Sequence, residues 1–282
     1  MHWWKKTMRT LRRPFRMRIL DRHGIAVLCR SCNGLLAVEA GDFSIGRTLL
    51  KTGKYDWDEI QWLRDITQDQ CGFLLVVGGH VGSLAVPLAE NFRNVQVFEA
   101  DPRNFELLSI NLKLNDRIHV QAFNLAVGAK TQMVGLTRNN LNTGNTSVGT
   151  LNKAGQSVEM VRLDAVLPDQ TIDLMVMDIE GHEPQAIAGA GLLFDKVQKL
   201  YMEFAPNHLR AQGNDPEAFF RQLCRVFPYR NWLHKKAVNE LLNDDLSAWL
   251  ARAGSKKDFV ENVLFSREPL QPGSRIPSVR KD

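Results

Sequence analysis

Glycine and acidic residues recur in a spacing that suits chemistry on a nucleotide-like cofactor. Gly78, Gly79 and Gly82 allow a tight turn and a close approach of the backbone to a ligand, and Glu99 follows about 20 residues later. An acid at this distance typically holds a ribose hydroxyl. The pattern Gly-Gly-His-Val-Gly is not the G-x-G-x-x-G of a dinucleotide-binding protein, and its spacing suits S-adenosylmethionine better than NAD.

A second polar stretch runs from Asp178 to Glu183, directly after an apolar run. Ligands in open α/β sheets bind beyond the carboxyl ends of the strands, so we expect Asp178 and Glu180 beside the glycine turn. A carboxylate there can take a proton from a hydroxyl, with His182 or His80 as the alternative base, whereas Asp178 can instead cap the next helix. These polar residues could also bind a divalent cation, but side chains at adjacent positions rarely point to one ion. We therefore predict no metal site.

Runs of apolar residues predict the elements that position these side chains. Short runs between polar turns predict strands, and apolar residues at every third or fourth position predict helices. The predicted strands are 25–28, 35–38, 73–77, 95–98, 118–122, 157–163, 172–177, 199–204, 229–233 and 259–265. The predicted helices are 56–66, 84–89, 103–115, 185–193, 216–227 and 241–253. Their alternation indicates an α/β fold with helices on both faces of a sheet.

Residues 130–168 interrupt this alternation with a segment rich in Thr, Asn and Gly. A long polar segment inside an α/β domain is usually functional when it is ordered. The alternative is a solvated loop between two strands. If it is functional, we expect it to shape the substrate side of the site together with residues 234–253.

The positive charge of the chain is concentrated at one end. Residues 1–23 contain eight Lys or Arg residues and one acid, Asp21, so the net charge of this segment is +7. The net charge of the whole chain is +5, so the remaining residues carry about −2. A body that is not basic argues against a nucleic-acid partner.

The same N-terminal segment interleaves its basic residues with Trp3, Trp4 and other apolar side chains, which predicts a basic amphipathic helix. It has no uninterrupted apolar core, so it is neither a signal peptide nor a membrane span. Two interpretations stay open: peripheral contact with an anionic membrane, or packing on the domain or on a partner subunit. The oligomeric state stays open too, with a homo-oligomer as one alternative.

The four cysteines do not form a recognisable metal or redox motif. Cys29 and Cys32 have C-x-x-C spacing, but no second pair completes a zinc site and the context of a redox helix is missing. We interpret them, with Cys71 and Cys224, as reduced thiols of a cytoplasmic protein.

Four stretches together resemble the FkbM-type family of S-adenosylmethionine-dependent methyltransferases. They are VVGGHVGS at 76–83, FEADPRNFELLSINLKLN at 98–115, the Asn-Leu-Ala-Val-Gly loop at 124–128 with the later Asn-Thr-Gly turn, and LMVMDIEGHE at 174–183. The resemblance runs from about Gly53 to Phe265.

The resemblance implies a seven-stranded, Rossmann-like methyltransferase sheet over residues 71–267. An N-terminal module at 24–70 precedes it, and a flexible tail at 268–282 follows. The implied cofactor is S-adenosyl-L-methionine. Its implied binding residues are Gly78, Gly79, His80, Gly82, Glu99, Ala100, Asn124, Ala126 and Asp178, with the adenine near Asn124 and Ala126. The reaction centre is expected at Asp178, Glu180 and His182.

The first loop departs from the family pattern Asp-Val-Gly-Ala-Asn-x-Gly. Val76, Gly79 and His80 stand at its Asp, Ala and Asn positions, so one polar anchor is lost. The favoured function is O-methylation of a hydroxyl on a sugar or small metabolite. One alternative is a noncatalytic or degenerate protein of this fold that acts through a partner. An NAD-dependent oxidoreductase is the other, and the glycine spacing disfavours it.

Overall fold

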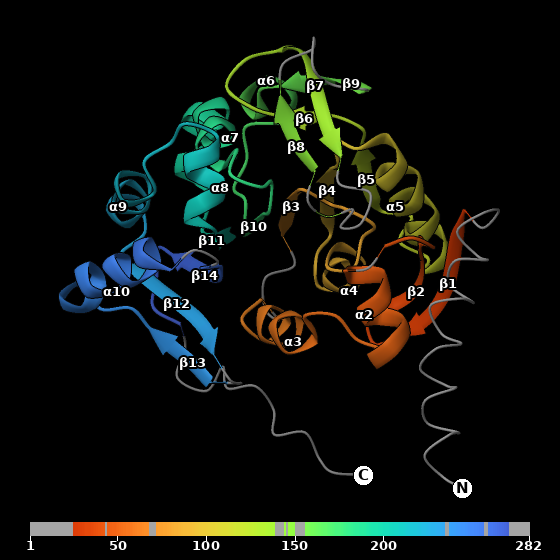
Figure 1. The fold of residues 1–282 in the computed structure, drawn as a ribbon, viewed down its shortest axis with the longest axis horizontal. Coiled ribbons are helices and arrows are strands. Elements are labelled where there is room, and N and C mark those ends of the chain that lie inside the picture. Colours follow the sequence, from red (N-terminus) through yellow and green to blue (C-terminus); the bar gives the residue numbers. More distant parts are fainter. Residues whose placement is uncertain are drawn as a thin grey trace, which may run out of the picture.

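The computed structural model describes residues 25–42, 44–67, 72–138, 144, 146–149, 156–234, 237–256 and 259–270. At its centre lies a mixed sheet with helices on both faces (Figure 1). Its eight strands, in spatial order, are β13 (Ala237–Glu240), β12 (Tyr229–His234), β14 (Glu261–Ser266), β11 (Lys199–Phe204), β10 (Leu174–Met177), β3 (Phe73–Val77), β4 (Asn94–Phe98) and β5 (Val120–Phe123). The five strands from β11 to β5 are parallel, and the other three are antiparallel.

The prediction of seven strands in this sheet is wrong, because β13 adds an eighth. It folds back on β12 as a hairpin in which Leu233 is opposite Val238. Its sequence, Ala-Val-Asn-Glu, is short and half polar, so it gave no strand signal of its own. The pairing with β12 makes it a strand.

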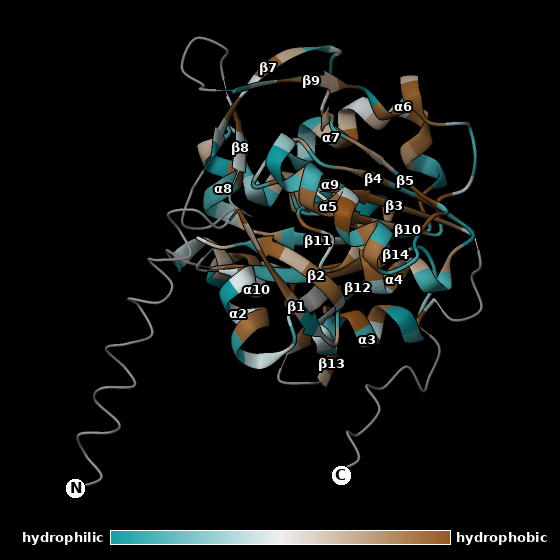
Figure 2. Ribbon diagram, turned by 90° about the vertical axis from the view of Figure 1, so that its right-hand side faces the viewer, coloured by the Kyte–Doolittle hydropathy of each residue, from teal (hydrophilic) through white to brown (hydrophobic). Residues whose placement is uncertain are grey.

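Each face of the sheet has its own apolar core, because side chains alternate along a strand. Leu74 and Val76 of β3 face one side, which is covered by α3 (Trp57–Asp65), α4 (Ala85–Leu88) and α5 (Pro102–Leu114). Leu75 and Val77 face the other side, which is covered by α7 (Glu183–Ala190), α9 (Pro216–Val226) and α10 (Asn243–Ser255). Figure 2 shows this pattern as apolar colour on the central strands.

The predicted N-terminal strands are confirmed, and they form a separate hairpin on the outside of α5. It consists of β1 (Ala26–Ser31) and β2 (Gly34–Glu39), followed by α2 (Ile45–Thr52). Asn111 of α5 accepts a hydrogen bond from the N–H of Ala37 at 2.6 Å and donates to its carbonyl at 2.9 Å. Asn115 makes the same pair of bonds to Leu35. Two side-chain amides, of which that of Asn111 is buried, therefore fix the hairpin to the domain.

The polar segment after residue 130 contains strands of its own. A second sheet has the order β6 (Ala126–Val127), β9 (Gln156–Val161), β7 (Gln132–Arg138) and β8 (Thr146–Gly149). The alternative of one solvated loop is therefore wrong for 132–138 and 146–149, where the alternating apolar residues were hidden among polar ones. Figure 1 shows this small sheet above the carboxyl ends of β3 and β4.

Some expectations fall on other parts of the chain. Residues 1–23, predicted as a basic helix, and 271–282 of the predicted tail lie outside the described residues. Within the described part, Cys29, Cys32 and Cys224 are free thiols, and no helix has the length and apolarity needed to cross a membrane.

Arg138 at the end of β7 ties the second sheet to the main domain. Its Nε lies 2.8 Å from Oδ2 of Asp101, whose side chain is completely buried, and its guanidinium also pairs with Glu39 of β2. Asp101 in turn caps α5, accepting hydrogen bonds from the N–H groups of Arg103 and Asn104. One arginine therefore connects three parts of the fold.

We expect Arg138→Gln to lower the free energy of unfolding by about 3 kcal/mol, because it leaves the Asp101 carboxylate buried without its charge partner. Arg221→Gln is the matched control, since Arg221 pairs with Glu217 on the exposed surface of α9 and should cost less than about 1 kcal/mol. Urea unfolding of both variants measures the difference. Equal losses would contradict a structural role for the Arg138 ion pair.

Candidate active site

The carboxyl ends of β3 and β10 meet at the backbone. The N–H of Asp178 donates to the carbonyl of Val77 at 3.0 Å, and Gly78 follows with φ of 93°. A Cβ on Gly78 would lie 1.9 Å from the carbonyl oxygen of Asp178. The predicted position of Asp178 beside the glycine turn is confirmed, and no side chain fits at residue 78.

The other two glycines let the turn pack on its neighbours. The N–H groups of Gly78 and Gly79 both donate to the carbonyl of Phe98 at the end of β4, at 2.9 and 3.0 Å. A Cβ on Gly79 would lie 2.3 Å from Cγ1 of Val97, and one on Gly82 would lie 2.9 Å from Cδ1 of Leu108. These two glycines therefore have packing roles.

Glu99 is buried at the end of β4 and holds the turn. Its Oε2 accepts a hydrogen bond from the N–H of His80 at 2.6 Å, and its Oε1 accepts one from the N–H of Asp101 at 2.8 Å. Burial raises the pKa of Glu99 to about 7. Asn124 braces the same backbone, since its amide donates to the carbonyls of Glu99 and Ala100 at 2.9 and 3.0 Å.

A pocket opens at these strand ends, beneath the second sheet. The pocket brings together most of the residues predicted from the sequence, namely Gly78, His80, Glu99, Ala100, Ala126, Asp178, Glu180 and His182. Gly79, Gly82 and Asn124 do not line it.

Apolar residues that the sequence reasoning missed form the walls of the pocket. They come from α2 and from the second sheet, and they are Ile45, Leu136 and Val148. The only available signal was the alternation of apolar residues within 132–138, which the surrounding polar residues obscured. The ion pair between Arg138 and Asp101 links the second sheet, which covers the pocket, to the main domain beneath it.

Asp178 lies among acids. It is open to the pocket but surrounded by protein, and burial raises its pKa to about 8, with Glu180, Glu183 and Asp56 adding to the effect. Burial and the same acidic surroundings raise the pKa of Glu203, at the end of β11, to about 9. The site therefore favours positive charge.

The two histidines of the predicted site differ in position. His80 occupies the left-handed region with φ of 45°, and burial lowers its pKa to about 4, so the ring is neutral at pH 7. His182 also lines the pocket, and its Nε2 would be 3.1 Å from a Cβ on Gly128. Both ring nitrogens of His182 are buried and have no hydrogen-bond partner among the described residues. They are free to bind a polar group of a ligand.

Val76, at the position of the family's acid, lies within the sheet. It is opposite Val97 of β4 and Val176 of β10, and its side chain is buried. The anchoring of the turn that such an acid would supply is provided here by Glu99, through its bond to the N–H of His80.

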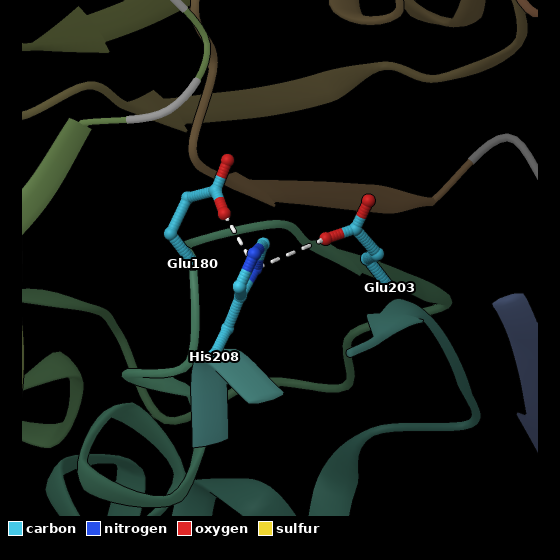
Figure 3. Close-up of side chains that lie close together, drawn as sticks. All are labelled: Glu180, Glu203 and His208. Carbon is cyan, nitrogen blue, oxygen red and sulfur yellow. Dashed lines mark ion pairs between the residues drawn. The ribbon is translucent and has the colours of Figure 1, made fainter. Parts of the chain in front are cut away.

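Another group of polar side chains comes from the turn after β10, from β11 and from the helix after it. Nδ1 of His208, from α8 (Pro206–Ala211), lies 2.7 Å from Oε2 of Glu180 and 3.9 Å from Oε2 of Glu203 (Figure 3). His208 is absent from the predicted site, because it is 30 residues from Asp178 and only the pairing of β10 with β11 brings α8 to this edge.

The chain belongs to the FkbM methyltransferase family. The model of the methyltransferase FkbM domain matches residues 77–246, more than half of the chain. No curated protein matches the sequence.

Three solved structures are similar to parts of the chain. A methyltransferase FkbM from Methylobacillus flagellatus KT is 15% identical with a TM-score of 0.44, over 69% of this chain and 43% of that one. An rRNA methylase from Streptococcus thermophilus is 10% identical with a TM-score of 0.42, over 75% and 95%. The bifunctional kinase-methyltransferase WbdD is 11% identical with a TM-score of 0.46, over 80% and 42%. The chain thus spans less than half the length of the FkbM and WbdD structures.

The raised pKa of Glu99 predicts that the stability of the protein depends on pH. The pKa in the folded state, about 7, exceeds the ordinary value of 4.5, so the folded state binds more protons than the unfolded state between these values. The stability contributed by the protonated acid is complete below about pH 4.5 and is lost as the pH rises through 7.

We therefore expect Glu99→Gln to reduce the loss of stability between pH 5 and pH 8 by about 1–3 kcal/mol. The difference between the two pH values is what counts, because the amide also disturbs the bonds to His80 and Asp101 at every pH. Glu106→Gln, on the exposed side of α5, is the control. Urea unfolding gives the values, and an unchanged pH dependence in Glu99→Gln would contradict the burial argument.

Proposed function

We propose that the protein is an S-adenosylmethionine-dependent O-methyltransferase that acts on a hydroxyl of a sugar or other small metabolite. The observation that carries the proposal is the meeting of β3, β4 and β10 at one pocket, which places the glycine turn, Glu99 and Asp178 around a single space. Membership of the FkbM methyltransferase family supports the methyl transfer.

The residues of the pocket fit this cofactor. Its acidic end, at Asp178 and Glu180, suits the positive sulfonium and amino groups of the molecule. Apolar side chains at the other end, such as Leu125 and Ala126, suit the faces of an adenine ring. The unpartnered ring nitrogens of His182 can bond to polar atoms of the adenine. Glu99 is placed for the ribose, as the family resemblance implies.

When bound, the cofactor supplies a methyl group on a positively charged sulfur. The chain holds and orients the acceptor hydroxyl in line with that group, and orientation of this kind supplies much of the rate. Asp178 is open to the pocket at the acidic end and accepts the proton of the hydroxyl in its ionised form, which the positive sulfonium of the bound cofactor would favour. Glu180 lies beside it and fixes the position of the acceptor.

The acceptor binds beside Asp178, among other polar side chains. Asp56 and Glu203 interact electrostatically with Asp178, and Tyr55 interacts with both Asp178 and Glu203. Carboxylate and phenol groups hydrogen-bond well to the hydroxyls of a polyol. This supports a sugar-like acceptor and gives no reason to expect a nucleic acid.

We predict micromolar binding of S-adenosylmethionine and S-adenosylhomocysteine, measured by calorimetry. Glu99→Ala should abolish binding, because it removes the group that holds the His80 N–H and faces the ribose. His182→Phe should weaken binding about 10-fold, the value of one lost hydrogen bond. Glu106→Ala on the exposed side of α5 is the control and should bind normally.

The absence of binding to the wild-type chain would contradict the proposal. It would favour the alternative of a noncatalytic protein of this fold, in which Val76 and His80 have removed the cofactor site. Retained binding in Glu99→Ala would instead place the cofactor elsewhere.

Once a screen of sugar and metabolite hydroxyls provides an acceptor, Asp178→Asn tests the base. We expect turnover to fall about 100- to 10,000-fold, the usual contribution of a positioned base, while affinity for S-adenosylhomocysteine stays within a few fold. Single-turnover kinetics at saturating cofactor measure the chemical step. Full turnover in Asp178→Asn would show that Asp178 is not the base.

A further inference from the structure

We propose that Glu180, Glu203 and His208 form a binding site for one divalent transition-metal ion, next to the methyl-transfer pocket. Each residue offers one ligand atom, and the three atoms lie within 4.8 Å of one another. Two carboxylate oxygens and one imidazole nitrogen are donors that suit Mn²⁺ or Zn²⁺. The sequence pointed away from a metal, because it offered only the adjacent residues 178–183.

The three side chains come from three elements that converge on one point. Glu180 lies in the turn after β10, Glu203 is on β11 near its carboxyl end, and His208 is on α8, with its ring between the two carboxylates (Figure 3). Gly181 permits this approach, since a Cβ there would lie 2.3 Å from the carbonyl oxygen of His208. Parallel strand pairing and a close helix contact therefore assemble the set.

His208 and Glu180 form a close buried pair. Nδ1 of His208 lies 2.7 Å from Oε2 of Glu180, and both atoms are buried. A divalent ion about 2.1 Å from each of these atoms would take the place of the proton that lies between them.

The charge around the three residues also calls for a cation. Asp56, Asp178 and Glu183 act electrostatically on Glu203, in addition to Glu180. In the part of the chain that the structure describes, His208 is the only basic side chain that pairs with any of these five acids. One imidazole thus faces five acidic side chains, and a divalent ion would add two positive charges beside them.

Three protein ligands leave coordination positions open. Glu180 lines the pocket on one side and contacts His208 on the other, so an ion held here lies at the edge of the space beside Asp178. An acceptor hydroxyl bound to it would lose its proton more readily, and that proton passes to Asp178. This role of the ion rests on the proposed function, whereas the existence of the site does not.

The test is a titration of the chelator-treated full chain with Mn²⁺, followed by electron paramagnetic resonance. We expect saturable binding of one ion per chain and a nitrogen coupling from the imidazole in pulsed spectra of the wild type. Glu203→Gln and His208→Gln should each weaken binding about 10-fold or more, and His208→Gln should remove the nitrogen coupling. Glu217→Gln, an exposed acid on α9, is the matched control.

The absence of saturable binding, or equal binding in all variants, would overturn the metal site. The wild-type nitrogen coupling tests the site even where a variant fails to fold, since its absence would exclude His208 as a ligand. Calorimetry with S-adenosylhomocysteine in the presence of a chelator separates the two proposals. If Mn²⁺ binds but S-adenosylhomocysteine does not, only the methyl-transfer function is contradicted. If S-adenosylhomocysteine binds but Mn²⁺ does not, only the metal site is contradicted.

Discussion

The structure depends on a backbone contact between two parallel strands. Gly78 at the end of β3 and Asp178 at the end of β10 approach so closely that a methyl group on Gly78 would lie 1.9 Å from the carbonyl oxygen of Asp178. Side chains larger than hydrogen cannot occupy this position. The contact places the glycine turn and the acidic turn at one edge of the sheet, and every group in the candidate site is positioned relative to that edge.

A second constraint is the concentration of negative charge at the same edge. Buried acids are costly unless they are protonated, hydrogen-bonded or paired with a cation. Glu99 is held by the N–H groups of His80 and Asp101, whereas Asp178 and Glu203 lie mainly among other acids. The positively charged cofactor and the divalent ion that we propose would each supply positive charge at this edge.

Local patterns in the sequence predicted the parts of the site that lie within one strand–turn–helix unit. The turn at Gly78 and Glu99 belongs to such a unit, and so does the acidic turn at Asp178, because a buried strand ends just before each of them. The second sheet, which covers the pocket, could not be predicted, because strands such as β7 form only by pairing with one another. The ion pair between Arg138 and Asp101, which holds this sheet to the domain, joins residues 37 positions apart in the sequence.

The convergence of His208 with Glu180 and Glu203 escaped prediction for a similar reason. It requires the register of β10 with β11 and the docking of α8 against Gly181, neither of which leaves a periodic signal in the sequence. The structural role of Asn124, whose amide donates hydrogen bonds to backbone carbonyls, could not be predicted either. The sequence does not distinguish an asparagine that bonds to the backbone from one that contacts a ligand. The positions of these side chains therefore depend on contacts between segments that are distant in the sequence, which local patterns do not predict.

The most direct test of the central claim, that the pocket between the sheet edge and the second sheet is the cofactor site, is hydrogen exchange with and without S-adenosylhomocysteine, read by mass spectrometry. We expect slower exchange in peptides that cover 78–83, 98–104, 124–128 and 178–183, and no change in α9. Protection confined to other segments, or no protection at a saturating concentration, would contradict it.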